Sequence, residues 1–231
     1  MSKRGEMMTY VWIGLLMVLS YFLGSIPSGL IIGKVFKNID IRQHGSKNTG
    51  ATNAIRVLGF KYGVWAFVFD MAKGAMVIFI VFLLGPTYYI VSDFEINIAS
   101  VYGMMAVLGH VWPIYINFKG GKAVATSAGM IFAIEPFVAI AVIIIFFIVF
   151  FTIRIVSLSS TIAAISALIY FIFRTFVEIG RPNFNQATRI MDLVIVVILA
   201  TIIFIRHRAN YKRLAMGTEY KFAKKNKKDA V

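Results

Sequence analysis

The stretch AIAVIIIFFIVFFTI, residues 139–153, contains no charged side chain and a single threonine. A second run of the same kind, LVIVVILATIIFI, occupies residues 193–205. A water-soluble domain has no place to bury several such runs, whereas a helix that crosses a bilayer needs about 17–25 predominantly apolar residues. These stretches therefore indicate helices that span a lipid membrane.

The composition supports this interpretation. Apolar residues make up 59% of the 231 residues and charged residues 15%, whereas soluble domains are about half apolar and about a quarter charged. The chain has no cysteine, which excludes disulfides, thiolate metal sites and a thiol nucleophile. With a bilayer established, the net charge of +14 favours anionic lipid and phosphorylated substrates as partners, and not nucleic acid.

Seven apolar segments are predicted to cross the membrane, and the fourth is short because Glu135-Pro136 closes it. They are Tyr10–Ile32, Val64–Leu84, Ile96–Ile116, Ala123–Phe132, Phe137–Ile153, Leu158–Phe173 and Met191–Ile205. We therefore predict an all-α polytopic membrane protein with one domain, residues 1–231. The first segment is interpreted as a span, with a cleaved signal peptide as the alternative, because no cleavage site follows Leu23.

The distribution of lysine and arginine predicts the orientation. A cytoplasmic C-terminus places most basic loops inside, and it leaves the acidic loop of residues 85–95 outside. The N-terminus then lies outside, in a bacterial plasma membrane. Residues 220–231 are expected to form a flexible, basic cytoplasmic tail that contacts anionic lipid.

Three polar segments interrupt the apolar background, and all three fall on the predicted cytoplasmic face. The first joins GSIPSG, residues 24–29, to the loop DIRQHGSKNTGATN, residues 40–53, and closes with Arg56. Its glycines allow close backbone approach to an anion, and its hydroxyl, amide and guanidinium groups add donors. An ordinary connecting loop is the alternative, although such a connector needs neither this length nor this density of donors.

The second polar segment is GHVWP, residues 109–113, followed by FKGGK, residues 118–122. A Gly-Gly step followed by lysine at the start of a helix suits phosphate, because free amides, the helix dipole and an ammonium group converge there. It is not a P-loop, since the required glycine and hydroxyl positions hold Ile116 and Ala123. A turn carrying positive-inside lysines is the alternative.

The third polar segment is RHRANYKRL, residues 206–214, followed by GTE, residues 217–219. At helical spacing His207, Asn210 and Arg213 or Leu214 share one face, which can look back at the other two segments. Inside the second span, Asp70 and Lys73 lie one turn apart and are predicted to form a structural ion pair.

These three motifs, in this order and spacing, resemble the bacterial acyl-phosphate:glycerol-3-phosphate acyltransferases, the PlsY family. The resemblance covers nearly the whole chain. It implies a seven-span enzyme with an active site at the cytoplasmic interface. Such an enzyme transfers an acyl group from acyl phosphate to the 1-hydroxyl of sn-glycerol 3-phosphate, giving lysophosphatidic acid and phosphate. The implied partners are these two substrates, membrane lipid and the enzyme that makes acyl phosphate.

The motifs and the resemblance together give four candidate catalytic residues: Ser46, Lys122, His207 and Asn210. The candidate substrate-binding residues are Arg56, Asn48, Thr52, Asn53, His110, Lys119, Gly120, Gly121, Ser157, Arg213 and Glu219. The general base stays open between His207 and a phosphate oxygen. The sequence has no cluster of carboxylates and histidines that suggests a metal site, so we expect no metal and no cofactor. We also expect a monomer.

Two positions depart from the family pattern. Lys47 stands where the family usually has glycine in its G-S-G-N motif, and Ala123 stands where glycine follows G-G-K. A glycine at such a place can serve a backbone with positive φ. Lys47 puts bulk and charge into the expected phosphate loop.

Two other classes of function compete with acyl transfer. A transporter of a small phosphorylated solute would explain the intramembrane charges, but transporters usually carry polar residues at the midplane and paired halves. A non-catalytic binder of anionic lipid would act through its basic tail alone.

Overall fold

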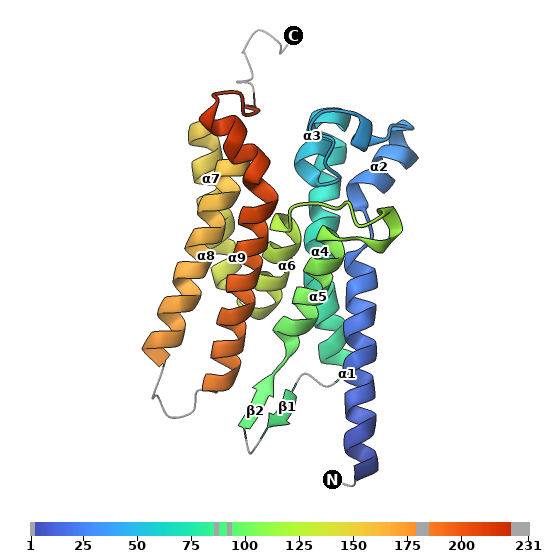
Figure 1. Ribbon diagram of the computed structural model, residues 1–231, viewed down its shortest axis with the longest axis vertical. Helices are drawn as coiled ribbons and strands as arrows, with labels where there is room; N and C mark the ends of the chain where they lie inside the picture. Colours follow the sequence, from blue (N-terminus) through green and yellow to red (C-terminus); the bar gives the residue numbers. More distant parts are fainter. Residues whose placement is uncertain (1–2, 86–87, 92–93, 179–184, 223–231) are drawn as a thin grey trace.

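In this computed structural model, the described residues are 3–85, 88–91, 94–178 and 185–222. They form nine α-helices, two short 3-10 turns and one hairpin (Figure 1). The helices are α1 (Lys3–Gly24), α2 (Ser28–Lys37), α3 (Ala51–Leu58), α4 (Phe60–Leu84), α5 (Ala99–Val111), α6 (Val124–Ile134), α7 (Pro136–Ile153), α8 (Val156–Glu178) and α9 (Gln186–Ala215).

Six segments of the described chain are long and apolar enough to cross a membrane: helices α1, α4, α7, α8 and α9, and the segment of residues 99–116, which contains α5 and the 3-10 turn after it. Helix α6 is apolar but shorter, and it ends where Glu135 and Pro136 start the next helix. The prediction of an all-α protein with six full spans and one short span is therefore confirmed. The expected tail is described only as far as Phe222, and residues 223–231 lie outside the described part.

The first predicted span was wrong at its C-terminal end. Helix α1 stops at Gly24, and α2 begins at Ser28 as a separate helix. Pro27 explains the break, because proline has no N–H and its ring clashes with the carbonyl four residues earlier. Lys73 on α4 stabilises the broken segment, since its Nζ donates to the Ile26 carbonyl over 2.9 Å. The same Nζ lies 2.8 Å from the Asp70 carboxylate, which confirms the predicted ion pair.

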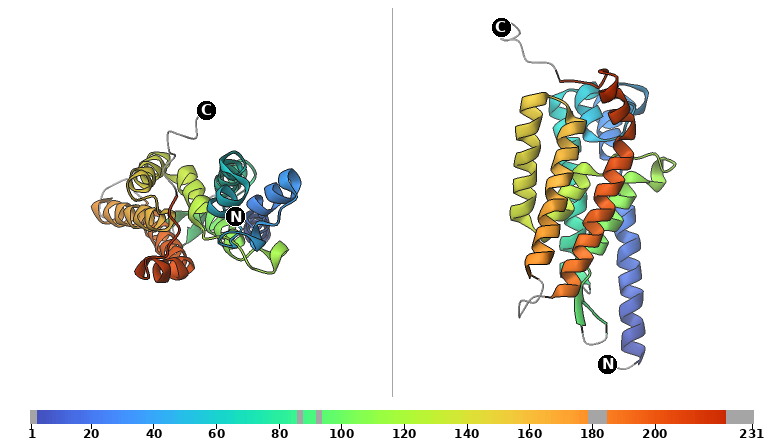
Figure 2. Two further views of the ribbon diagram at one scale, coloured as in Figure 1. Left: turned by 90° about the horizontal axis from the view of Figure 1, so that it is seen from above. Right: turned by 60° about the vertical axis from the view of Figure 1, so that its left-hand side comes forward.

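A small antiparallel hairpin adds to the helical body. Strand β1 (Tyr88–Val91) pairs with β2 (Phe94–Asn97), where the sequence predicts a loop as far as Glu95 and the start of the third span at Ile96. The Asn97 N–H donates to the Thr188 hydroxyl over 2.8 Å, which links the hairpin to the start of α9. The hairpin lies at the end of the bundle opposite α3 and the C-terminal end of α9 (Figures 1 and 2).

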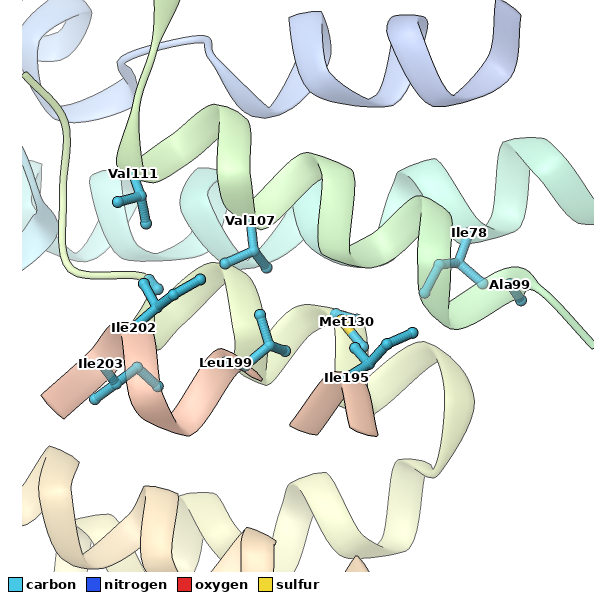
Figure 3. Packing of buried hydrophobic residues seen from close by; sticks show 10 residues of the cluster. Ile78, Ala99, Val107, Val111, Met130, Ile195, Leu199, Ile202 and Ile203 are labelled. Atoms are coloured by element: carbon cyan, nitrogen blue, oxygen red, sulfur yellow. The ribbon is translucent and has the colours of Figure 1, made fainter. Parts of the chain in front are cut away.

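Helix α6 joins the two sides of the bundle. Helices α1–α5 lie on one side of it and α7–α9 on the other (Figure 1). Its Met130 packs with residues of α4, α5 and α9, among them Ile78, Val107 and Leu199 (Figure 3). Glycines bring α4 and α6 into backbone contact: Gly74 faces the Thr126 carbonyl, and Gly129 faces the Met71 carbonyl. Small residues permit such close approach between membrane helices.

Replacing Gly129 with leucine is expected to destabilise the fold, because even a Cβ atom there would overlap the Met71 carbonyl. Overpacking costs roughly 1–3 kcal/mol, and separating two backbones pushes this change toward the upper limit. Thermal unfolding in detergent, followed by size-exclusion chromatography, measures the loss. Gly14→Leu is the matched control, because no atom lies within 4 Å of a Cβ at Gly14. Equal unfolding temperatures for the two variants would contradict the packing account.

Candidate active site

Lys122 lies at the start of α6, at the end of the bundle that carries α3 and the C-terminal end of α9. Its half-buried ammonium group donates a hydrogen bond to Oδ1 of Asn210 on α9. The turn before α6 depends on Ala123, whose φ of 72° is in the left-handed region. The pKa of Lys122 is lowered to about 8, chiefly by burial; Glu219 opposes this shift, and neighbouring Arg213, Arg56 and Arg206 add to it.

Glu219 belongs to the same hydrogen-bonded network, which runs from Lys122 through Asn210 to its carboxylate. Its side chain is 3% exposed. It accepts hydrogen bonds from Asn210 Nδ2 at 2.6 Å, from Arg213 Nε at 2.7 Å and from Ser157 Oγ at 3.0 Å. Burial raises the pKa of Glu219, but these hydrogen bonds outweigh it and hold the pKa below its usual value. Glu219 is therefore a carboxylate, and both of its oxygens are used inside the protein.

Asn210 connects the two charged groups through its amide. Lysine can only donate and a carboxylate can only accept, so the Asn210 oxygen faces Lys122 and its nitrogen faces Glu219. The sequence placed Lys122 and Asn210 on separate motifs 88 residues apart, and the structure brings them into contact.

His207 lies one turn before Asn210 on α9 and is 2% exposed. Its Nδ1 is 2.8 Å from the Ile203 carbonyl. A carbonyl oxygen only accepts, so Nδ1 carries the proton and Nε2 has a free lone pair in the neutral ring. Lys122 and Glu219 are both within electrostatic range of this ring.

Arg56, in the last turn of α3, faces the segment that follows α9. Its guanidinium carbon lies 4.9 Å from the ring centre of Tyr220 and 5.3 Å from that of Phe222. Among the described residues its guanidinium has neither a hydrogen bond nor an ion pair. Electrostatic coupling to Glu219 and Arg213 places it with the Lys122 network.

Gly120 and Gly121 do not present the free amides that the sequence suggested. Their N–H groups donate to the carbonyls of Val111 and His110, over 3.2 and 3.0 Å, because the turn folds back on the end of α5. Glycine is needed for this fit, since a Cβ at Gly121 would overlap the His110 ring. Arg206 holds the other face of the turn by donating to both glycine carbonyls, at 2.9 and 3.2 Å.

His110, a predicted substrate ligand, is buried near the end of α5, beside Asp70. Its Nδ1 lies 3.5 Å from the carboxylate of Asp70, and its side chain is 8% exposed. It therefore belongs to the buried group formed by Asp70 and Lys73. Lys119, three residues before Lys122, is exposed.

The loop of residues 38–50 is organised by Asn53, whose side chain is buried. Its Nδ2 donates to the carbonyls of Ile41, His44 and Asn48, and its Oδ1 accepts from the Ser46 N–H over 2.8 Å. The Asn48 side chain accepts from the Gly50 N–H over 2.9 Å. The amide groups of both asparagines thus shape the loop itself. Ser46 and Thr52 are half-buried near the start of α3.

Lys47 has a φ of 57°. Lys47 and Ala123, the two residues that stand where the family has glycine, therefore both adopt the left-handed backbone region that glycine tolerates best. Lys47 thus adopts a positive φ, and its side chain is exposed.

Three residues of this site were missed from the sequence as site residues: Arg206, Tyr220 and Phe222. Arg206 opens the third polar motif but was not among the candidate site residues, although α9 continues past it to Ala215. Tyr220 and Phe222 were assigned to the basic tail. The available signal was their position, since Tyr220 directly follows Glu219 of the third motif and Phe222 stands two residues further on.

Comparisons with known proteins show the family of the chain. The family model described as glycerol-3-phosphate acyltransferase matches residues 14–217. Glycerol-3-phosphate acyltransferase of Acholeplasma laidlawii is 41% identical over 225 residues, which cover 94% of this chain and 96% of that protein. The enzyme of the same name from Macrococcus caseolyticus is 44% identical over 212 residues, 90% of this chain and 96% of that one.

Solved structures give the same result. The crystal structure of PlsY, an integral membrane glycerol 3-phosphate acyltransferase, in its glycerol 3-phosphate form matches with a TM-score of 0.75 and 36% identity. Its lysophosphatidic acid form matches with a TM-score of 0.73. Each comparison covers 90% of this chain and 94% of the other. The chain belongs to the glycerol-3-phosphate acyltransferase family.

Proposed function

We propose that this protein transfers a fatty acyl group from acyl phosphate to the 1-hydroxyl of sn-glycerol 3-phosphate, giving lysophosphatidic acid and phosphate. The observation that carries the proposal is the charge balance around Lys122. Arg56, Arg206 and Arg213 act on its ammonium group together with one carboxylate, Glu219. Arg213 already pairs with that carboxylate, so the site has an excess of positive charge that suits two phosphorylated substrates.

Lys122 is the proposed ligand of the donor phosphate. One of its three ammonium hydrogens is engaged by Asn210, which fixes the direction of the group and leaves two hydrogens for phosphate oxygens. The half-buried position strengthens this interaction, because the surrounding protein screens charge less than water does. Lys122 also stabilises negative charge as it grows on the reacting carbonyl and the leaving phosphate. Ser46 is proposed to add a hydroxyl donor.

Arg56 and His207 are proposed to orient glycerol 3-phosphate. Arg56 offers a planar set of N–H donors that matches phosphate oxygens. His207 offers the Nε2 lone pair as a hydrogen-bond acceptor for the attacking hydroxyl. The network of Asn210, Ser157, Arg213 and Glu219 holds these groups in place.

The transfer needs no covalent enzyme intermediate. The oxygen of the 1-hydroxyl attacks the carbonyl carbon, and a tetrahedral intermediate forms. Its collapse breaks the bond between that carbon and the bridging oxygen of the phosphate, which leaves with the electron pair. The hydroxyl proton passes either to His207 Nε2 or to an oxygen of the departing phosphate. Acyl phosphate is already activated, so a serine nucleophile is unnecessary.

The proposed location is the bacterial plasma membrane, with the Lys122 end of the bundle on the cytoplasmic side and the N-terminus outside. Glycerol 3-phosphate is water-soluble, whereas the acyl chain of the donor stays in the bilayer, so a site at the end of the helices reaches both. We further propose that the protein acts as a monomer and receives its donor from an enzyme that makes acyl phosphate.

The proposal is tested with purified protein in lipid vesicles, supplied with radiolabelled glycerol 3-phosphate. Acyl phosphate should give labelled lysophosphatidic acid, and acyl coenzyme A in a parallel reaction should give none. Product from acyl coenzyme A alone would overturn the proposed donor. No product from either donor, in a sample that remains folded, would overturn the function.

The rate at low substrate concentration should fall as the pH rises through about 8, the pKa of Lys122. Below that pH the ammonium group is charged and binds phosphate. Above it kcat/KM should fall, by up to about tenfold for each pH unit.

The free energy of unfolding should rise over the pH range in which kcat/KM falls. The pKa in the folded state is below 10.5, so neutralisation removes a cost of burying charge between about pH 8 and 10.5.

A pH–rate profile of the wild type and of Lys122→Arg checks this prediction. The arginine variant should lose the decline near pH 8, because its guanidinium stays charged. Lys119→Ala, at an exposed lysine nearby, should keep the decline. An unchanged profile in Lys122→Arg would assign the titration to another group.

A further inference from the structure

The segment after α9 is fixed on both sides of Tyr220. On one side, Glu219 is held by its three hydrogen bonds to α8 and α9. On the other side, the Phe222 N–H donates to the Arg154 carbonyl over 3.0 Å, between α7 and α8. The Phe222 ring also packs edge-on against Phe150, with ring centres 5.5 Å apart. The direction of both aromatic rings is therefore set by the α7–α9 side of the bundle.

Both aromatic rings make cation–π contacts with arginine side chains. Arg56 lies over Tyr220 and Phe222 at the distances given above, and Arg213 lies 5.5 Å from the same Tyr220 ring. The ring of Tyr220 is thus shared by one guanidinium from α3 and one from α9. Helix α3 belongs to the α1–α5 side (Figure 1), so this stack links the two sides of the bundle across the proposed site.

The choice of aromatic partners has a chemical consequence for Arg56. A carboxylate partner would occupy the N–H groups of the guanidinium, and a phosphate would then compete with it. An aromatic face attracts the cation through its quadrupole and leaves the N–H edge of the plane unused. This matches the absence of any hydrogen bond or ion pair of Arg56 within the described part of the chain. The contact fixes the plane of the guanidinium while its donors stay available.

We propose that Tyr220 and Phe222 are positioning residues that orient the Arg56 guanidinium toward the phosphate of the glycerol substrate. The inference rests on the proposed function and extends it to a part of the chain outside the three polar motifs. It assigns the start of the C-terminal segment to substrate recognition, whereas its later lysines are expected to contact lipid.

Steady-state kinetics on Tyr220→Ala/Phe222→Ala test the proposal. The KM for glycerol 3-phosphate should rise about 5- to 20-fold, as expected for loss of two partly exposed cation–π contacts. The kcat should stay within about threefold, because the contact orients bound substrate and touches no reacting atom. Tyr220→Phe keeps the ring and should keep the wild-type KM. Tyr220→Leu alone serves if the double variant fails to fold, since Tyr220 is 43% exposed.

A double-mutant cycle separates positioning from a general structural effect. In an Arg56→Ala background, removing the two rings should change the KM by less than about twofold, because the group they orient is already gone. Phe60→Ala is the matched control, since Phe60 is a 76% exposed aromatic residue at the start of α4. Its KM should equal that of the wild type.

The inference fails if the double alanine variant keeps the wild-type KM, or if the KM rises equally with and without Arg56. Both results would leave acyl transfer itself intact. A wild-type protein that makes no lysophosphatidic acid would instead overturn the proposed function. The two failures are therefore distinguishable in the same assay.

Discussion

Lys122→Ala is expected to lower turnover on the order of 100- to 1,000-fold, the range found when a group that stabilises developing negative charge is removed. The alanine variant loses the ammonium group that the half-buried position and the hydrogen bond to Asn210 direct into the site. Folding should be little affected, because Asn210 keeps its bond to Glu219 and Lys122 is only half-buried. Initial rates of lysophosphatidic acid formation in lipid vesicles measure the effect.

Lys119→Ala is the control for the loss of one positive charge at the same turn. Lys119 is exposed, so its removal should change turnover by less than about threefold through general electrostatics. If Lys122→Ala also remained within about threefold of the wild type, the phosphate role of Lys122 would be wrong.

Glu219→Ala is expected to have the largest effect on stability. The change leaves a buried amide, a hydroxyl and a guanidinium without their acceptor. A buried donor left without its acceptor costs about 1–3 kcal/mol, so the loss of these contacts together should cost several kcal/mol. Activity should fall with it, because Asn210 and Arg213 lose the group that orients them. Thermal unfolding and turnover are both measured.

Two further variants separate charge from hydrogen bonding at Glu219. Glu219→Gln keeps one acceptor oxygen and should retain part of the stability, while losing the ion pair with Arg213. Asp40→Ala removes an acidic residue whose pair with Arg42 is more exposed, and it should cost less than about 1 kcal/mol. If Glu219→Ala were as stable as Asp40→Ala, Glu219 would not hold the site together.

The sequence predicted most of the fold because hydrophobic runs long enough to cross a bilayer have few alternative structures. The spans, the short α6 and the Asp70–Lys73 pair all follow from local patterns. The break at Pro27 was missed, since apolar residues resume at Leu30–Ile32 and the whole stretch was assigned to one span. The break is stabilised by Lys73 on α4, 47 residues away, a contact that no local pattern reveals.

The site residues were predicted as a set, but the contacts of each residue were not. Motif spacing selected Lys122, Asn210 and Glu219, and the structure joins them in one hydrogen-bonded chain. Gly120 and Gly121 looked like amide donors because glycine signals both anion binding and close packing. Here their amides bond to the end of α5. Whether a glycine pair binds an anion or packs closely depends on the helix beside it, and the sequence does not show which helix that is.

The central claim is that this site moves an acyl group from a phosphate to glycerol 3-phosphate. Its most direct test follows lysophosphatidic acid and inorganic phosphate together, in vesicles that contain wild-type protein, acyl phosphate and radiolabelled glycerol 3-phosphate. The account predicts that the two products appear in equal amounts and only when both substrates are present. Phosphate released without lysophosphatidic acid, or labelled glycerol 3-phosphate that crosses the membrane unchanged, would contradict it.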